Sequence, residues 1–504
     1  MFPTKEVYNM FEKITPEEAG VSSAQVAKFI SNLNRFGFAM HNVLMMKGDK
    51  IFAEYYWKPF HKDFIHRMYS QTKTHAAIAI GFLEQEGKLS LDDKLVDIFR
   101  DKITTPVPES LEKQTIREML TMSTVNGYKW WMQEKDAIDR TALYLNDRPM
   151  NTRPSRTLWN YDTDGSYMLG AVAERLSGMP LFDYLDDRLY KKLGAFENGY
   201  MLLSRDDVAW GDSGLMSTPR DMLAFARFVM NYGKWNGEQI LNEKFLRDAT
   251  SKQVDNRATA HNQYMNMGYG YQIWRGEKNS FMFRGMGMQD TLCFPDQDVI
   301  CLVNADIQYN NAARPLVYTN FIDLILDNMS DTPLPKNPEA AAKLAAATDN
   351  LELVSVKGLE DSPYRQIIND KVYKLDNNPM GITKISFHFN DAKTGEIRYT
   401  NAQGDKVLPF GVNHNVYGKF PQLGYAGLHG CVKTTDGMMY DDAVSLAWAE
   451  ENRVLVYTQI IDKYYGNTSW TIGFRDGRIA IEMYKNGEFF LNEYQGRAVG
   501  DLAE

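Results

Sequence analysis

A serine and a lysine three residues apart, Ser70 and Lys73, have the types and spacing needed for nucleophilic catalysis. They precede an apolar run, residues 76–83, typical of a buried helix, so both side chains would share one helical face. A serine hydroxyl is a weak nucleophile until a base removes its proton. A desolvated lysine is pushed toward the neutral amine, and the helix start adds N–H groups that favour an oxyanion. Taken alone, the motif is more often an ordinary solvated helix start.

A tyrosine in a polar loop, Tyr161, is a candidate second proton-transfer group. It lies before residues 171–178, which have helical periodicity and end at a glycine. A phenol beside a cation gives up its proton more readily, and Lys73 would be such a cation. A half-buried aromatic ring with its hydroxyl in water remains the alternative interpretation.

A glycine-rich bend follows in residues 281–303. Residues 281–284 and 299–303 are predicted to be strands, with Gly285 and Gly287 between them. Glycine in a strand often marks a place where a ligand approaches the backbone closely. An ordinary bulge is the alternative.

These three elements, in this order, resemble the motifs of the serine β-lactamase and penicillin-binding-protein superfamily. The class C-like branch, with its esterase and amide-hydrolase relatives, is the most similar. Intervening segments resemble that branch too: GKLSLDDKL at 87–95, TIREMLTMS at 115–123 and GLMSTPRDM at 214–222. The resemblance covers residues 15–328. It implies an α+β fold, with an antiparallel sheet flanked by helices, a helical subdomain, and an active site in the cleft between them.

The resemblance implies a role for each matching residue. Ser70 would be the acylated nucleophile, and Lys73 would deprotonate it or hold its proton network. Tyr161 would act as general base in acylation, deacylation or both. The backbone N–H groups of Ser70 and Met286 would form the oxyanion hole, and Gly285 would let the acyl group approach the strand.

Two positions depart from the family pattern. Thr163 stands where the family often has Asn, so contacts to a substrate amide are expected to differ. Phe283 replaces the Lys or His that contacts a substrate carboxylate in relatives. The next residue, Arg284, is expected to face away because alternate strand residues point to opposite faces, unless a bulge at Gly285 re-aims it. An apolar ester or amide is therefore favoured over a β-lactam or a cell-wall peptide.

Composition narrows the class of protein. Hydrophobic residues make up 44% and charged residues 24% of the 504 residues, and the net charge of −9 argues against nucleic-acid binding. The cysteines (Cys293, Cys301, Cys431) are too few for a disulfide framework, and the histidines are scattered, so no metal and no cofactor are expected. The sequence shows no export signal and no apolar stretch of membrane-spanning length, which predicts a cytoplasmic protein with no membrane partner.

Three parts are expected along the chain. Residues 1–330 would form the hydrolase domain, within which Trp130 and Trp131 are a candidate aromatic wall or plain core. Residues 331–349, rich in proline and then alanine, would form a linker with a short helix. Residues 350–504 read as short strands separated by turns, which favours a sandwich or small barrel. The expected core of this last part consists of Trp448, Trp470, Phe474 and Phe489.

The favoured interpretation is a serine hydrolase that cleaves an ester or amide of a small molecule through an acyl-enzyme on Ser70. One alternative is an acyltransferase that passes the same acyl group to an alcohol or amine. Another is a β-lactamase or D,D-peptidase. A catalytically silent binding or scaffold protein is a further alternative, motivated by Phe283 and Thr163. The expected partner is a small-molecule substrate, and homo-oligomerisation is left open.

Overall fold

The computed structural model describes residues 11–125, 137–147, 153–257, 266–308, 310, 312–425 and 438–503. Trp130, Trp131 and Cys431 lie outside these residues. Within the described part of the chain, a first compact unit ends at Glu352 and a second begins at Leu353. Each unit is described by itself.

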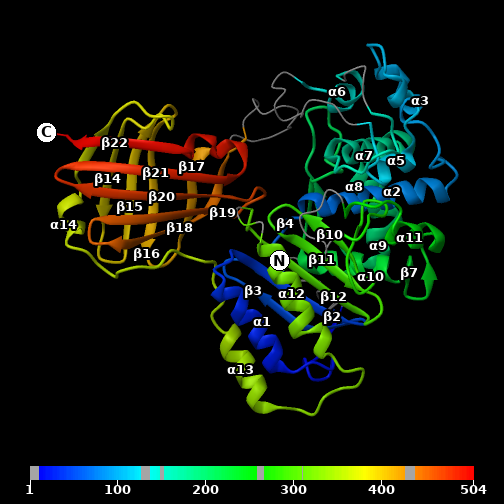
Figure 1. The fold of residues 1–504 in the computed structure, drawn as a ribbon, viewed down its shortest axis with the longest axis horizontal. Helices are drawn as coiled ribbons and strands as arrows, with labels where there is room; N and C mark the ends of the chain where they lie inside the picture. The colour runs from blue at the N-terminus through cyan, green and yellow to red at the C-terminus, as the bar shows by residue number, and fades with distance from the viewer. Residues whose placement is uncertain are drawn as a thin grey trace, which may run out of the picture. The chain divides into compact units, whose positions relative to one another are not determined.

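An antiparallel sheet forms the centre of the first unit (Figure 1). In the described residues it has seven strands in the spatial order β1–β3–β2–β12–β11–β10–β9, and β1 pairs with β3 in parallel. The strands are β1 (Glu12–Lys13), β2 (Met40–Lys47), β3 (Lys50–Tyr56), β9 (Trp274–Arg275), β10 (Phe281–Gly285), β11 (Gln289–Phe294) and β12 (Val299–Ala305). The two predicted strands correspond to β10 and β12, and β11 lies between them in this sheet.

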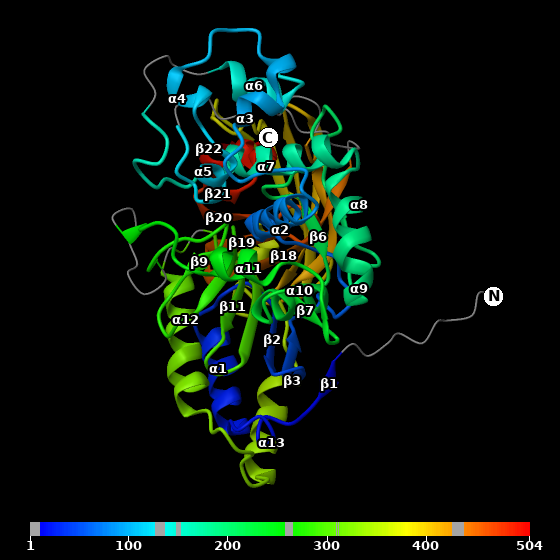
Figure 2. The same cartoon turned by 90° about the vertical axis from the view of Figure 1, so that its right-hand side faces the viewer.

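The two faces of the sheet are covered by different helices. Val43, Met45 and Met282 pack with α1 (Ser23–Arg35) and α12 (Ala313–Leu324), which lie side by side on one face (Figure 2). Leu44 and Phe283 point to the other face and pack with α2 (Thr72–Gln85) and α10 (Pro219–Met230). This alternation is the period-two pattern of a strand that is buried on both sides.

Helix α2 is the central helix of the unit. Its side chains from Thr72 to Leu83 are all buried, because the helix is apolar around most of its circumference and is enclosed by the sheet and the helical region.

The helical region consists of α3 (Leu95–Ile98), α4 (Glu109–Glu112), α5 (Ile116–Leu120), α6 (Arg140–Asn146), α7 (Thr163–Ser177), α8 (Leu181–Leu185), α9 (Lys191–Leu193) and α11 (Glu243–Thr250). Small sheets join β4 (His66–Arg67), β6 (Leu215–Ser217) and β5 (Tyr200–Met201), and β7 (Lys234–Trp235) with β8 (Glu238–Gln239).

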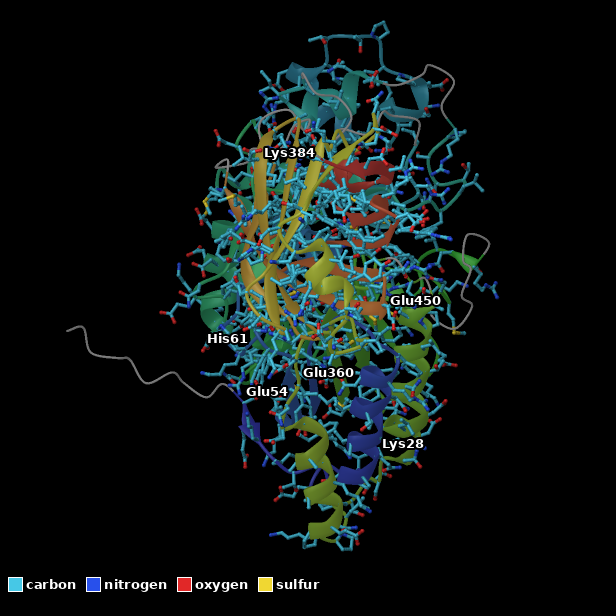
Figure 3. The ribbon with its side chains drawn as sticks, turned by 90° about the vertical axis from the view of Figure 1, so that its left-hand side faces the viewer. Lys28, Glu54, His61, Glu360, Lys384 and Glu450 are labelled. Atoms are coloured by element: carbon cyan, nitrogen blue, oxygen red, sulfur yellow. The ribbon has the colours of Figure 1, made fainter. Side chains whose placement is uncertain are left out.

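A buried carboxylate, that of Glu54 (labelled in Figure 3), ties the edge of the sheet to α10. Arg220 donates to both of its oxygens at 2.7 Å, Lys13 lies 2.6 Å away and the Tyr56 hydroxyl donates at 2.8 Å. Burial alone would raise the pKa of Glu54, but these donors lower it to about 2. Glu54 is therefore ionised throughout the physiological pH range.

The alanine-rich helix predicted in the linker is present as α13 (Pro338–Thr348), with Asn337 as its N-cap. Its residues Ala340 and Leu344 are buried, and the helix packs against α1. It belongs to the first compact unit, which extends to Glu352. The helix is thus part of the packed unit, whereas the sequence predicts a spacer.

The second unit is a β-barrel, one of the two predicted forms (Figure 1). Nine strands of the described chain pair in the order β16–β15–β14–β13–β22–β21–β20–β19–β18, and a parallel pairing of β16 with β18 closes the ring. Strand β17 also pairs with β18. The strands are β13 (Val372–Leu375), β14 (Lys384–Phe389), β15 (Thr394–Asn401), β16 (Gly404–Val412), β17 (Val416–Leu423), β18 (Met439–Glu450), β19 (Arg453–Ile460), β20 (Gly466–Arg475), β21 (Arg478–Gly487) and β22 (Gly496–Leu502). Helix α14 (Tyr364–Ile368) precedes β13.

The barrel core contains most of the predicted aromatic residues. Trp448, Trp470 and Phe474 are buried, whereas Phe489 is half-buried and its neighbour Phe490 takes the buried position. None of the helices in the described ranges combines the length and the apolar character needed to cross a bilayer.

Candidate functional site

The segment carrying Ser70 is a tight turn that leads directly into α2. A short 3-10 helix, η1 (Tyr69–Gln71), holds the serine, and Tyr69 has the left-handed φ of +46°. A bulky residue rarely adopts this conformation, and such strain persists only where the surroundings enforce it. Here the Thr72 hydroxyl donates to the Tyr69 carbonyl at 2.6 Å and accepts from the Leu215 N–H at 3.0 Å. The half-buried Ser70 is thereby held between α2 and β6.

Lys73 contacts Ser70 directly. Its Nζ lies 2.8 Å from the Ser70 Oγ and donates to the Asp212 carbonyl at 2.9 Å. The Lys73 residue is 1% exposed. The Lys73 amine is thus held against the Ser70 hydroxyl in a buried position, within reach of the proton that the serine must lose.

The Tyr161 ring lies near the Lys73 amine. The Lys73 Nζ is 5.0 Å from the Tyr161 ring centroid, which is a cation–π distance. Asp162 is the N-cap of α7 and accepts from the Gly165 N–H at 2.8 Å, which fixes the loop that carries the tyrosine. The structure therefore brings together the serine, the lysine and the tyrosine that the sequence placed about ninety residues apart.

Gly285 ends β10 against the turn before the nucleophile. A Cβ added at Gly285 would lie 2.4 Å from the Met68 carbonyl oxygen, so only glycine fits here. The Gln289 side chain donates to the Met286 carbonyl at 2.7 Å, and Arg314 donates to the Gly285 carbonyl at 2.6 Å. The backbone of the predicted oxyanion-hole strand is thus fixed from two sides, while the Met286 side chain is exposed.

Phe283 and Thr163 lie in different environments. Phe283 is fully buried, and its ring packs with those of Phe225 and Phe281 at 5.6 and 6.0 Å. Its side chain is therefore part of the core between the sheet and α10. Thr163 is half-buried at the first position of α7, next to Tyr161.

Arg284 does not turn away from the site, although it obeys the strand alternation and shares the Met282 face. Its guanidinium lies 4.3 Å from the ring centroid of Trp274, and that ring stacks on Tyr161 at 5.6 Å. It also donates to Asn266 at 3.1 Å. Burial and the neighbouring Arg314 lower the pKa of Arg284 to about 10. Strand alternation therefore holds, and it places Arg284 over Trp274 of the neighbouring strand β9, whose ring connects the guanidinium to Tyr161.

His66, just upstream of the nucleophile, is buried in a histidine pair. Its Nε2 lies 2.8 Å from the His41 Nδ1, and its Nδ1 contacts the Arg67 carbonyl at 2.9 Å. Burial lowers the pKa of His66 to about 3, so the ring is neutral near pH 7. These contacts indicate that His66 has a structural role next to the turn that carries Ser70.

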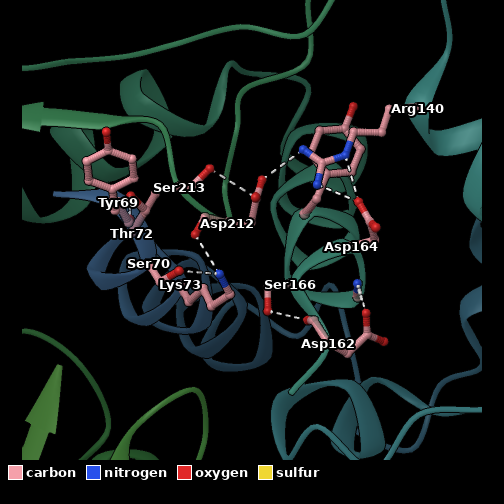
Figure 4. Close-up of polar contacts among 12 residues, drawn as sticks. Tyr69, Ser70, Thr72, Lys73, Arg140, Asp162, Asp164, Ser166, Asp212 and Ser213 are labelled. Atoms are coloured by element: carbon pink, nitrogen blue, oxygen red, sulfur yellow. Dashed lines mark hydrogen bonds and ion pairs between the residues drawn. The ribbon is translucent and has the colours of Figure 1, made fainter. Parts of the chain in front are cut away.

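Sequence reasoning missed a charged network behind Lys73, which Figure 4 shows. Arg140 donates to Asp212 at 2.9 Å and to Asp164 at 2.9 and 2.5 Å. All three residues are at most 3% exposed. They come from three separate segments without a common motif, and only Asp164 lies in a stretch that the sequence singled out.

The comparison with known families agrees with this geometry. The family model described as Beta-lactamase matches residues 33–320, which is more than half of the chain. The chain therefore belongs to the beta-lactamase family, as the motifs predicted, and members of this fold family are serine hydrolases.

Individual relatives are distant. The 6-aminohexanoate-dimer hydrolase of Paenarthrobacter ureafaciens is 20% identical over 215 residues, which cover 40% of this chain and 55% of the relative. The chain thus spans about half the length of this curated relative. The solved structure of EstCE1, a hydrolase with promiscuous acyltransferase activity, has a TM-score of 0.50 and 15% identity over 60% of this chain and 99% of its own. At that identity the likeness concerns the fold alone.

Proposed function

We propose that this protein is a serine hydrolase that cleaves small esters or amides through an acyl-enzyme on Ser70. The observation that carries the proposal is the 2.8 Å contact between the Lys73 Nζ and the Ser70 Oγ, made by a lysine buried beside a tyrosine. A nucleophile in direct contact with a base, and a second group orienting that base, is the arrangement that nucleophilic catalysis requires.

The proposed reaction has two halves. In the first, the neutral Lys73 amine takes the Ser70 proton, and the Oγ attacks the substrate carbonyl. The backbone N–H groups of Ser70 and Met286 hold the oxyanion, and the leaving alcohol or amine departs with a proton passed through Lys73 and Tyr161. In the second half, the same groups take a proton from water, and the resulting hydroxide attacks the acyl carbon. The bond to the Ser70 Oγ then breaks, the carboxylic acid leaves, and the same groups return the proton to the Oγ.

A short-chain p-nitrophenyl ester tests the proposal. Wild type is expected to release nitrophenol in a burst and to gain the mass of the acyl group, because an activated ester should acylate the serine faster than water removes the acyl group. Ser70→Ala should show neither, with an unchanged thermal transition. Release by Ser70→Ala at the wild-type rate would overturn the nucleophile assignment. No adduct on folded wild type, across esters, anilides and the 6-aminohexanoate dimer named for the relative, would favour a silent binding protein.

Arg284 is proposed to recognise an anionic end of the substrate. It is the cation at the end of β10, and the stacked rings of Trp274 and Tyr161 connect it to the catalytic groups. Arg284→Gln is expected to raise KM about 10-fold or more for an ester with a terminal carboxylate, since a charge-assisted hydrogen bond is worth about 1.5–3 kcal/mol. KM for the matching uncharged ester should hardly change.

The control for this prediction is Arg275→Gln on β9. Arg275 bonds the Thr250 carbonyl and Asn279, so its loss should affect both esters alike. Equal losses of both esters in Arg284→Gln would mean that Arg284 only supports the Trp274 ring.

A further inference from the structure

Three buried charged residues from different elements meet behind the catalytic lysine (Figure 4). Arg140 begins α6, Asp164 lies in the first turn of α7, and Asp212 precedes β6. The Arg140 guanidinium bonds both carboxylates and lies 4.1 Å over the Tyr167 ring. The planar guanidinium is held on three sides, so it fixes the positions of the two carboxylates and of the segments that carry them.

Asp212 connects this network to the reacting groups through two different atoms. Its carboxylate accepts from Arg140 at 2.9 Å and from the Ser213 hydroxyl at 3.0 Å. Its backbone carbonyl accepts from Lys73 at 2.9 Å. The position of that carbonyl therefore depends on how Arg140 holds the side chain of the same residue.

Stability alone explains such a network poorly. Desolvating several charges costs about as much as their attraction returns, and well-packed apolar residues often serve as well. Arg140 and Asp212 are both 1% exposed, so their desolvation is nearly complete. A role in the site accounts for retaining charge next to Lys73.

We propose that Arg140 is a positioning residue that acts through Asp212: it aims the Asp212 carbonyl at Lys73 and, with Asp164, sets the charge around the proton-transfer groups. This inference rests on the acyl transfer at Ser70 proposed above. It assigns a role to the helical region, which supplies both Arg140 and Asp164.

Burial and the neighbouring charges have opposite effects on the pKa values of the two carboxyl groups in the network. Burial raises the pKa of Asp164 to about 6 despite the opposing Arg140. Burial would also raise the pKa of Asp212, but the charges of Arg140 and Lys73 and the hydrogen bonds to Asp212 hold it below its ordinary value. Other ionisable groups that face these residues are Tyr161, Tyr167, Asp162 and Asp206.

The test compares the pH dependence of the acylation burst in wild type, Asp212→Asn and Asp164→Asn. Removing a negative charge makes the field at the base more positive, which favours its unprotonated form. The acid limb, which is the fall of the acylation rate toward low pH, should therefore move to lower pH. The expected shift is about 0.5–1 pH unit for Asp212→Asn and less for Asp164→Asn. Arg140→Gln should move it to higher pH. Both Asn substitutions keep the shape of the side chain, so the test stands even if Arg140→Gln does not fold.

Two controls separate positioning from general structural support. Arg140→Lys keeps the charge but loses the forked geometry, so the rate should fall about 10-fold or more without a shift of the limb. Glu54→Gln removes a different buried, arginine-bound carboxylate of the same unit and should leave the limb in place. Limbs that coincide in wild type and both Asn variants would overturn the proposal. A wild type without any acyl-enzyme would instead overturn the proposed function, and the inference with it.

Discussion

Lys73→Met is expected to slow formation of the acyl-enzyme by about 10²–10⁴-fold, the range of a general base. The substitution removes the amine that lies 2.8 Å from the Ser70 Oγ but keeps an unbranched side chain of similar length. Because Lys73 is almost fully buried, an apolar side chain of similar length suits its surroundings and should not lower stability. The measurement is the burst rate with a p-nitrophenyl ester at saturating concentration, together with the thermal transition.

Lys47→Met is the matched control. Lys47 donates to two backbone carbonyls, those of Ala19 at 3.0 Å and Ser330 at 2.9 Å, and contacts neither Ser70 nor Tyr161 in the described structure. Its loss should cost stability and leave the burst rate within about twofold. If Lys73→Met acylates at the wild-type rate, the base must be another group, and Tyr161→Phe would then be the variant that abolishes the burst.

Local spacing made part of the site predictable. Ser70 and Lys73 are one helical turn apart, so their contact follows from helix geometry once α2 exists. A glycine in a strand indicates that another group approaches the backbone closely, and at Gly285 the group seen in the structure is the Met68 carbonyl. The approach of an acyl group to Gly285 stays a prediction. The β-lactamase-type fold and the barrel were likewise predictable from the order of the motifs and from many short strands.

Other features depend on tertiary geometry that no short pattern carries. The network of Arg140, Asp164 and Asp212 joins residues from three segments, and each residue alone looks like an ordinary surface charge. Strand alternation correctly separates Phe283 from Arg284 but does not reveal that the Arg284 guanidinium lies over the Trp274 ring of strand β9. Likewise, an alanine-rich helix after a proline-rich stretch does not reveal that α1 offers a surface for α13.

Gly285→Ala is expected to lower kcat/KM by about 100-fold or more while the protein stays folded. The new Cβ would lie 2.4 Å from the Met68 carbonyl oxygen, a distance at which backbone must move. Met68 precedes the Ser70 turn by one residue, so the movement would separate the two N–H groups of the proposed oxyanion hole. A displacement of about 1 Å in a catalytic group can cost about 10²-fold, and loss of one oxyanion donor costs about 10²–10³-fold.

Gly473→Ala provides the comparison, because Gly473 also lies in a strand, β20 of the barrel, and a Cβ there meets no atom within 4 Å. This variant should keep wild-type kcat/KM. The burst with intact-mass detection distinguishes the causes in Gly285→Ala: slower acylation with an unchanged thermal transition is the expected result. Acylation at the wild-type rate would mean that β10 does not supply the oxyanion hole, and that Met286 has no part in stabilising the transition state.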